Sequence, residues 1–323
     1  MDLDLSKEHL LLRDTIREYM RAEVAPVIDE HEKARRFPRP IVDKLGTMGW
    51  LGIPFPEDEG GAGLDTLAYA IAVEEIGRVW GSLGLIVAAH TSLGCGPLHM
   101  IGTDEQKERF LVPMAQGRVL GAYGLTEPGA GSDSGGTRTM ARHEDGPDGG
   151  CWVLDGGKRF ITNAGEAGTY IVTARTGTRD DGAAEISAFI VTSDTPGFSV
   201  GRLEEKLGLH ASATGELVFD GARVPDANML GERGGGFKTF LRILDGGRIS
   251  IGALAAAQAK LFASEVSSRA TNAGIQVHGG YGYVEEYKVE RYLRDAKLTE
   301  IGEGTSQIQR LVIARKILGL RIV

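Results

Sequence analysis

The sequence predicts an α+β protein: an N-terminal helical domain, a middle antiparallel β-barrel or sandwich domain, and a shortened C-terminal helical bundle. Three observations predict this order. Apolar residues recur at helical spacing over residues 5–117, turn signals separate short β-rich runs over 118–230, and helical spacing returns after Gly235. We therefore expect domains at residues 1–117, 118–230 and 231–323.

Composition fits a packed globular protein. The chain has 323 residues, of which 42% are hydrophobic and 25% charged, which leaves room for two or three packed units. Its net charge of −8 argues against a general nucleic-acid binder. Cys95 and Cys151 lack metal-ligand spacing and are expected to be reduced. Without a signal-peptide pattern or an apolar run approaching ~18 residues, a cytoplasmic protein with no membrane span is expected.

The N-terminal third is predicted to be a series of helices. Apolar residues from Leu10 to Val24 lie near helical spacing, and a second apolar stripe begins at Ile41 after two prolines. Residues 67–79 are apolar almost throughout, which predicts a helix buried on most sides. Residues 102–107 read as a loop and a capped helix start. His90 and His99 have no cluster around them and are interpreted as packing or surface histidines.

The middle third has the pattern of an antiparallel β-domain, with a polar tract at 142–150 that reads as a solvated hairpin loop. Its expected strands are Cys151–Leu154, Tyr170–Ala174, Ile186–Thr192 and Glu216–Phe219.

After Gly235 the chain is expected to be helical again. Later helices are predicted to begin near Lys260 and Glu285, and a last one to run from Ser306 to about Leu318. Ser306 and Gln309 fit a capping box at the start of that last helix.

The stretch Tyr123–Asp133 is the first candidate for chemistry. A short β-type run ends in a Pro-Gly break and then in small hydroxyl and glycine residues, so the backbone can approach a bulky ligand closely. Its glycines do not have dinucleotide-fingerprint spacing, and no phosphate-loop lysine follows. From the residues alone, a ligand loop and an ordinary surface loop both remain open.

Glu303 is the second candidate. It lies between two glycines ahead of the last predicted helix, so its neighbours give it little side-chain cover. In an apolar pocket its pKa would be raised, as a base for a weak carbon acid needs. Alternatively, it is a helix-start acid that interacts with the helix dipole.

The run Leu-Thr-Glu-Pro-Gly-Ala-Gly-Ser-Asp at 125–133 resembles the signature of the acyl-CoA dehydrogenase family, and further matches follow in the family's order. The resemblance implies FAD-dependent α,β-dehydrogenation of an acyl-CoA thioester to the trans-2-enoyl-CoA, with electrons passed to an electron-transferring flavoprotein. Glu303 falls where most members carry the base that removes the α-proton. A minority carry it at the position of Gly247, where glycine cannot serve.

The resemblance also implies the binding residues, one position at a time. Phe160 and Thr162 resemble the aromatic and the hydroxyl beside the reactive edge of the flavin, although Phe160 alone also reads as a core residue. The implied FAD contacts are Tyr123, Leu125, Thr126, Ser132, Phe160, Thr162, Gln276, Gly280, Thr305 and Gln307. The implied substrate contacts are Ser132, Asp245, Arg248 and Gly304. Because Gln276 and Gly280 resemble a segment that contacts FAD from a neighbouring subunit, a homodimer or homotetramer is implied.

The chain departs from the family near Gln258. The family has most of two long helices there, including an Arg-x-x-Phe-Gly motif that holds the FAD pyrophosphate, and this chain passes straight through. A four-helix bundle needs roughly 100 to 120 residues, and about 88 follow Gly235. Either the missing residues are absent from the sequence in hand or the protein is truly shortened. Gly302 is a smaller departure, because many relatives have tyrosine there.

Two alternatives stay open beside the dehydrogenase. One is a shortened, catalytically silent homologue that acts as a binding or assembly partner, and the other is a relative that returns its electrons to oxygen. A metal hydrolase is disfavoured because the seven histidines are scattered without His-x-x-x-His spacing, and no metal is expected. A serine hydrolase is disfavoured because no Gly-x-Ser-x-Gly elbow is present.

Overall fold

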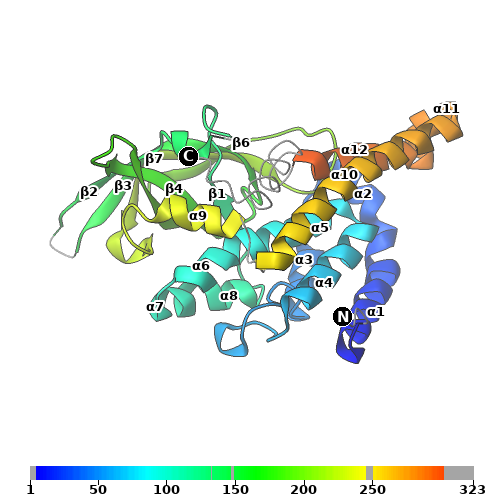
Figure 1. The fold of residues 1–323 in the computed structure, drawn as a ribbon, viewed down its shortest axis with the longest axis horizontal. Coiled ribbons are helices and arrows are strands. Elements are labelled where there is room, and N and C mark those ends of the chain that lie inside the picture. The colour runs from blue at the N-terminus through cyan, green and yellow to red at the C-terminus, as the bar shows by residue number, and fades with distance from the viewer. Residues whose placement is uncertain (1–4, 132, 147–148, 245–249, 302–323) are drawn as a thin grey trace. The chain divides into compact units, whose positions relative to one another are not determined.

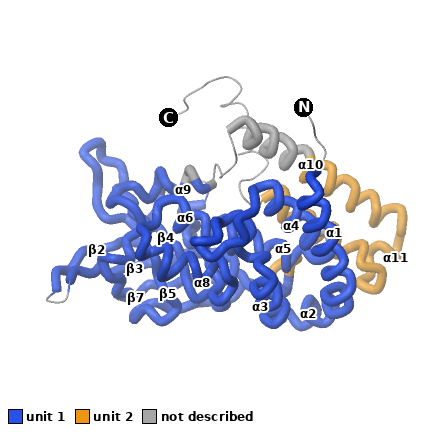
Figure 2. The backbone as a smooth tube through the Cα atoms, turned by 90° about the horizontal axis from the view of Figure 1, so that it is seen from below, with its two compact units in different colours: residues 1–205, 210–243 blue, residues 206–209, 244–323 orange. Residues whose placement is uncertain are grey.

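A computed structural model describes residues 5–131, 133–146, 149–244 and 250–301 of the chain. These residues fall into two compact units, and Figure 2 colours them separately. Unit 1 comprises residues 1–205 and 210–243, and unit 2 comprises residues 206–209 and 244–323.

The N-terminal part of unit 1 is helical, as the sequence predicts. Ser6 caps the first helix by accepting a hydrogen bond from His9 N–H (3.2 Å), and Thr103 and Gln106 form the expected capping box. The helices are α1 (Lys7–Tyr19), α2 (Ile28–Ala34), α3 (Arg39–Thr47), α4 (Thr66–Val79), α5 (Gly81–Ala88), α6 (Gly96–Ile101), α7 (Asp104–Gln106) and α8 (Val112–Ala115). π-Helical turns at Met20–Val24, Ala89–Cys95 and Lys107–Leu111 extend three of them.

One expectation about the apolar helices is wrong in detail. Helix α4 is not buried on most sides, because Leu67 and Ala70 are exposed while Ile71 and Ile76 face the core.

One helical stretch, Gly81–Ile101, is long and apolar enough to cross a membrane by length and composition. More than half of it (56%) is buried inside the protein, which is typical of a core helix and makes it weak evidence for a span.

The sheet of unit 1 has the strand order β6-β7-β3-β2-β4-β5-β8, with β1 paired to β4 off this path. Figure 1 shows the longer strands β2, β3, β4 and β7 together, with helices α3–α8 gathered beside them. The strands are β1 (Gly121–Gly124), β2 (Met140–Glu144), β3 (Cys151–Thr162), β4 (Thr169–Thr178), β5 (Ala184–Thr192), β6 (Phe198–Leu203), β7 (Thr214–Pro225) and β8 (Met229–Leu230).

Three details of the sheet differ from the sequence-based expectation. The sheet is mixed rather than antiparallel, because β1 runs parallel to β4, with Gly121 opposite Thr169. Strands β3 and β7 extend well beyond the predicted runs because glycines and polar residues pair inside them. The start of the polar tract 142–150 is strand rather than loop: His143 pairs with Trp152 across β2 and β3.

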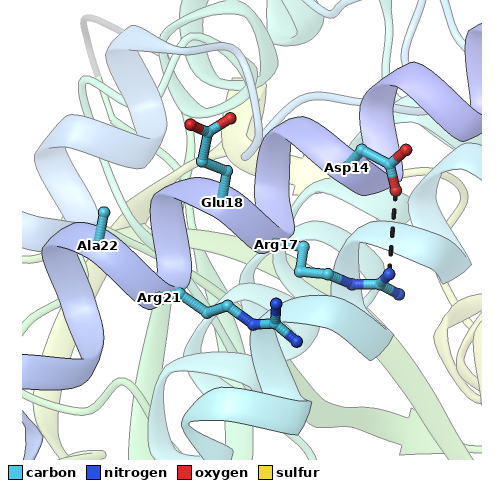
Figure 3. A pocket seen from close by; sticks show the side chains of 5 residues that line it. All are labelled: Asp14, Arg17, Glu18, Arg21 and Ala22. Atoms are coloured by element: carbon cyan, nitrogen blue, oxygen red, sulfur yellow. Dashed lines mark ion pairs between the residues drawn. The ribbon is translucent and has the colours of Figure 1, made fainter.

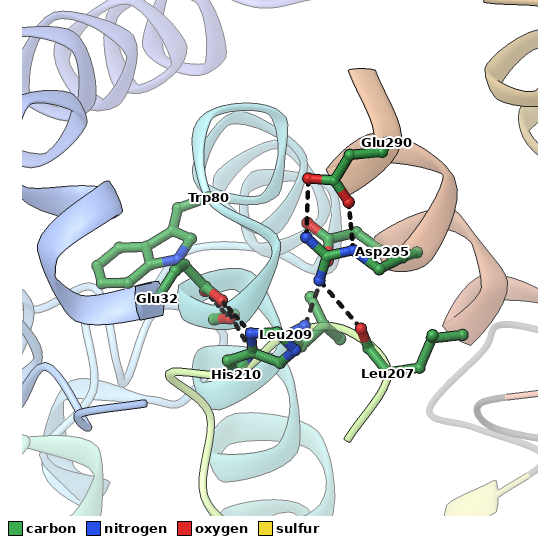
Figure 4. A network of polar contacts seen from close by, with 9 residues as sticks. Glu32, Trp80, Leu207, Leu209, His210, Glu290 and Asp295 are labelled. Atoms are coloured by element: carbon green, nitrogen blue, oxygen red, sulfur yellow. Dashed lines mark hydrogen bonds and ion pairs between the residues drawn. The ribbon is translucent and has the colours of Figure 1, made fainter. Parts of the chain in front are cut away.

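The core of unit 1 joins its helices to its sheet. One buried cluster contains Met20 of the first π-helical turn, Ile76 of α4, and Trp152 and Phe189 of β3 and β5. The buried carboxylate of Glu32 accepts hydrogen bonds from the Trp80 indole (2.7 Å) and the His210 backbone (2.9 Å), which ties the residues before β7 to the helices (Figure 4).

Unit 2 is helical. Helix α9 (Gly236–Leu244) precedes it, and it contains α10 (Ser250–His278), α11 (Gly280–Tyr283) and α12 (Val289–Ile301), with α10 packed against α12. Arg294 of α12 bonds to Glu290 (2.5 Å) and to the Leu207 carbonyl (3.0 Å), as Figure 4 shows.

The helix expected to begin near Lys260 does not exist as a separate element, because α10 runs unbroken through that position. Near Glu285 the structure has a 3₁₀ turn, Glu285–Tyr287, before α12. The predicted helix 306–318 lies outside the described residues.

Candidate functional site: a loop between two strands

Strand β1 delivers the glycine-rich loop to the site. The chain leaves β1 at Gly124 and forms a tight turn in which Glu127 and Ala130 exchange two backbone hydrogen bonds of 3.1 Å. Pro128 occupies the second position of this turn, where its fixed φ is favourable. Residues 133–137 then lead to β2, which begins at Met140. We call the described residues 125–131 and 133–139 the cradle loop.

The glycines of the cradle loop are not required by its own backbone. None of Gly129, Gly131, Gly135 and Gly136 has a positive φ. A methyl group added at Gly131 would meet no atom within 4 Å, and one at Gly129 would meet only the Arg138 guanidinium at 4.0 Å. Gly129 and Gly131 therefore present bare backbone to open space, as close approach by a bulky ligand requires, whereas Gly135 and Gly136 have Asp133 within contact distance.

Phe160 shows the clearest sign of a functional position. Its φ is 60°, a left-handed value rarely adopted by bulky residues, and it lies where the β3–β7 register shifts between Lys158 and Ile161. Its side chain is 58% exposed, so the interpretation of Phe160 as a core residue is wrong. A strained, exposed aromatic residue at a bulge is typical of a ligand contact.

The structure brings the two predicted flavin segments together. The Arg159 backbone N–H donates to the Thr126 carbonyl at 2.8 Å. The segment after β1 that contains Thr126 therefore lies next to the part of β3 that contains Phe160. Thr162, two residues farther along β3, is partly buried and pairs with Thr214. Tyr123, Leu125 and Thr126 follow one another at the end of β1, and hydrogen bonds from Lys158 and Arg159 place them next to the part of β3 that carries Phe160.

Tyr123 supplies an unsatisfied polar atom at the junction of β1 and β3. Its ring stacks on Phe240 of α9 with centroids 4.3 Å apart, and its buried hydroxyl has no hydrogen-bond partner among the described residues. Desolvation by burial raises the pKa of Tyr123, so the hydroxyl stays neutral and can donate or accept. Together with the open glycines and the exposed Phe160, it fits a planar aromatic cofactor. Phe240 was not predicted as a site residue; its pairing with Tyr123 depends on tertiary structure.

Two buried side chains that were not predicted as site residues hold the start of β1. His90 is fully buried: its Nδ1 accepts from Gly121 N–H at 2.9 Å, and its Nε2 bonds to the Met114 carbonyl at 3.1 Å. Asn163 donates to the Gly121 carbonyl at 3.1 Å and to the Ile86 carbonyl at 3.3 Å. Desolvation lowers the pKa of His90 to about 4, so it is neutral at pH 7. His90 is thus the packing histidine that the sequence predicted.

The remaining predicted residues divide into two groups. Gln276 of α10 and Gly280 of α11 are exposed on unit 2. The others lie outside the described residues: Ser132, Asp245, Arg248, Glu303, Gly304, Thr305 and Gln307.

Two surface hollows contain no predicted site residue. The first, of about 430 Å³, is lined by one face of the first helical segment, Asp14–Ala22, where Arg17 lies 3.9 Å from Asp14 (Figure 3). The same arginine bonds to the buried Glu75 at 2.7 Å, so it already has a structural partner. The second hollow is lined by residues of 103–110 and 226–229. Within the described ranges, no three potential ligands lie together to hold a metal ion.

Comparison with known proteins places the chain in a family. Three sequence profiles match: the acyl-CoA dehydrogenase N-terminal domain at residues 6–118, the middle domain at 122–222 and the C-terminal domain at 237–318. Among curated proteins, the probable acyl-CoA dehydrogenase YngJ of Bacillus subtilis is 44% identical, with 98% of this chain and 100% of the relative covered. The short-chain specific acyl-CoA dehydrogenase of Clostridium acetobutylicum is 41% identical at the same coverage.

Solved structures agree. Butyryl-CoA dehydrogenase from Megasphaera elsdenii superposes with a TM-score of 0.91 at 35% identity, covering 98% of this chain and 100% of that one. A chain from a structure described as the electron transferring flavoprotein of Acidaminococcus fermentans gives a TM-score of 0.92 at 37% identity, with the same coverage.

The alignments also measure a length difference. The alignment with the Bacillus relative runs over 383 positions, whereas this chain has 323 residues, so at least 60 positions have no residue here. Those positions lie inside an alignment that covers 98% of the chain. The sequence-based expectation puts the gap near Gln258, within the unbroken helix α10.

Proposed function

The chain belongs to the acyl-CoA dehydrogenase family, and we propose that it oxidises a short-chain acyl-CoA to the trans-2-enoyl-CoA at the junction of β1 and β3. It is an FAD-dependent oxidoreductase that acts on acyl-CoA. The observation that carries the proposed location is the strained, exposed Phe160 beside the cradle loop.

The residues at the junction fit FAD. Bound FAD would supply the acceptor for the β-hydrogen, which leaves the acyl chain as hydride. Leu125, Thr126 and the glycine backbone would line the ring, Phe160 would exclude water from its edge, and the Thr162 hydroxyl would donate a hydrogen bond. Ser132, Thr305 and Gln307 complete the proposed FAD contacts from outside the described residues.

Glu303 is the proposed catalytic base, and this proposal rests on the sequence resemblance. Its carboxylate takes the α-proton of the thioester, which is weakly acidic because the adjacent carbonyl stabilises the carbanion. Asp245, Arg248, Gly304 and Ser132 are the proposed substrate contacts.

A short acyl group is proposed from the relatives. The Clostridium enzyme is named short-chain specific, and so is the mitochondrial enzyme of Homo sapiens, which is 38% identical over 98% of this chain. The Megasphaera enzyme is a butyryl-CoA dehydrogenase.

An electron-transferring flavoprotein is the proposed electron acceptor, because the similar Acidaminococcus structure bears the name of that protein. A second candidate returns electrons to oxygen. It is motivated by the prolyl acyl carrier protein oxidase AnaB, which superposes with a TM-score of 0.85 at 26% identity.

A homodimer or homotetramer is proposed as the assembly. Gln276 and Gly280 lie on a part of unit 2 where Val277, Tyr281 and Tyr283 are also exposed, as expected for a segment that faces another subunit.

The proposal is tested by visible absorption spectroscopy of the FAD-loaded protein during anaerobic addition of butyryl-CoA and, separately, of a long-chain acyl-CoA. Butyryl-CoA should bleach the flavin bands and the long-chain substrate should do so far more slowly. Glu303→Gln should keep the flavin bands and lose the bleaching, while Glu286→Gln, at an exposed acid of unit 2, should behave like the wild type. Bleaching at the wild-type rate in Glu303→Gln would refute the assignment of the base. Subsequent reoxidation by air or by an electron-transferring flavoprotein separates the two acceptors.

A further inference from the structure

Lys158 and Glu127 form a buried ion pair that the reaction itself does not use. The two side chains are 0% and 5% exposed, and Lys158 Nζ lies 2.6 Å from Glu127 Oε1. The ammonium also donates to Thr173 Oγ1 at 3.1 Å and to the Leu125 carbonyl at 3.3 Å, so each of its three hydrogens has an acceptor.

The carboxylate of Glu127 closes the cradle loop. Its Oε2 accepts from Arg138 N–H at 2.7 Å, and its Oε1 accepts from Thr139 N–H at 3.1 Å. Desolvation by burial raises the pKa of Glu127, but the Lys158 charge and these hydrogen bonds outweigh it, so the pKa lies below its ordinary value. The first and last parts of the loop are therefore joined by one charged side chain.

Lys158 anchors this arrangement to the strand that carries Phe160. Its stem passes next to Gly124, where an added methyl group would lie 3.2 Å from Lys158 Cγ, closer than most such contacts. Arg159 N–H bonds to the Thr126 carbonyl one residue farther on. Strand β3, the end of β1 and both ends of the cradle loop thus meet at one ammonium-carboxylate pair.

A buried ion pair is weak evidence for stability, because its desolvation penalty offsets most of its attraction. In other proteins, replacing such a pair by apolar residues of similar volume is often neutral or stabilising. What such residues cannot do is fix the Leu125 carbonyl and the Arg138 and Thr139 amides in one geometry. The pair is therefore better explained by the shape that it imposes.

We propose that Lys158 and Glu127 are positioning residues that hold the cradle loop and Phe160 at the separation needed to bind FAD. This inference rests on the proposed flavin site. It assigns the pair no contact with the cofactor or the substrate.

The test uses Lys158→Met, Glu127→Gln and the double variant, with Arg142→Met as the matched control. Arg142 forms an exposed ion pair with Asp155 at 2.7 Å across β2 and β3, in the same sheet. Two quantities are measured: the Kd of the apoprotein for FAD by flavin fluorescence, and amide hydrogen exchange of residues 125–139 in the apoprotein.

Each single variant should bind FAD at least about tenfold more weakly than the wild type, because charged hydrogen bonds to the loop are lost. In the apoprotein of each single variant, amide exchange at residues 125–139 should be about tenfold faster than in the wild-type apoprotein. Arg142→Met should stay within about twofold of the wild type in both measurements. The double variant, which buries no unpaired charge, should unfold closer to the wild-type temperature while its FAD affinity stays low.

Recovery of FAD affinity in the double variant would overturn the inference, because the pair would then serve only to neutralise its own charges. Single variants with wild-type affinity and exchange would overturn it as well. A wild-type protein that takes up no FAD would instead overturn the proposed function together with the inference.

Discussion

At the scale of single residues, Phe160 combines three properties that a core residue does not have together. It has a left-handed backbone, it lies at a register shift, and its ring is exposed. The Arg159 guanidinium lies 5.3 Å from the ring centroid and covers part of it. The cost of a left-handed phenylalanine is of order 1–3 kcal/mol, and a ring that stays mostly exposed offsets only part of that cost.

Phe160→Asn should therefore leave the apoprotein as stable as the wild type or about 1 kcal/mol more stable, because asparagine tolerates a positive φ. The same change should weaken FAD binding, since the aromatic contact is lost. Denaturant unfolding of the apoprotein and FAD titration measure the two effects separately. Marked destabilisation of the apoprotein would show that the ring has a packing role. Phe198→Asn, at a phenylalanine packed between Tyr170 and Phe219, is the contrasting control and should destabilise.

At the scale of elements, β1 is placed by side chains from outside the sheet. His90 comes from the π-helical turn Ala89–Cys95 and Asn163 from the end of β3, and together they bind both polar backbone groups of Gly121. Gly94 packs directly on Gly121: a methyl group added at Gly94 would lie 2.9 Å from the Gly121 Cα. The helical turn Ala89–Cys95 and strand β1 are therefore in direct backbone contact, just before the chain enters the cradle loop.

His90 should make stability depend on pH. Burial lowers its pKa from 6.5 to about 4, so the unfolded chain binds this proton more readily than the native protein. The contribution is fully present above pH 6.5 and is lost as pH falls toward 4, by about 3 kcal/mol in total. Denaturant unfolding between pH 7 and 4 should show a smaller loss in His90→Gln than in the wild type. His99→Gln, at a half-exposed histidine, is the control; equal losses in wild type and His90→Gln would contradict the assignment.

Helix α10 shows how an element can hide a difference in length. The residues on either side of Gln258 all favour or tolerate a helix, with four alanines among Ala253–Ala257, so the chain continues as one helix of 29 residues. No glycine or proline interrupts it between Gly252 and its last turns. Local helix propensity favours this continuity.

At the scale of the whole molecule, the described helices α10, α11 and α12 of unit 2 expose several large apolar side chains. Val277 and Tyr283 are 84% and 82% exposed, and Tyr281 and Ile301 add to the same unit. Apolar surface of this extent in one small unit indicates an interaction surface. A second subunit is the proposed occupant.

Val277→Glu should weaken self-association about tenfold or more, because a buried valine contributes roughly 1.5–3 kcal/mol and a charge would be desolvated in its place. Light scattering after size-exclusion chromatography, over a range of protein concentrations, measures the change. Asn272→Glu, an exposed position of the same helix, should leave the assembly as it is. A wild-type protein that is monomeric at all concentrations would exclude the proposed assembly.

The sequence by itself determined the family and the order of helical and strand regions, because periodicity, turn residues and a nine-residue signature are local properties. It also singled out Phe160, although not its exposure. Tertiary structure alone decided that β1 runs parallel to β4, that Tyr123 stacks on Phe240, and that Lys158 reaches Glu127. Each of these joins residues at least 31 positions apart, and no local pattern encodes which distant partner fills a buried site.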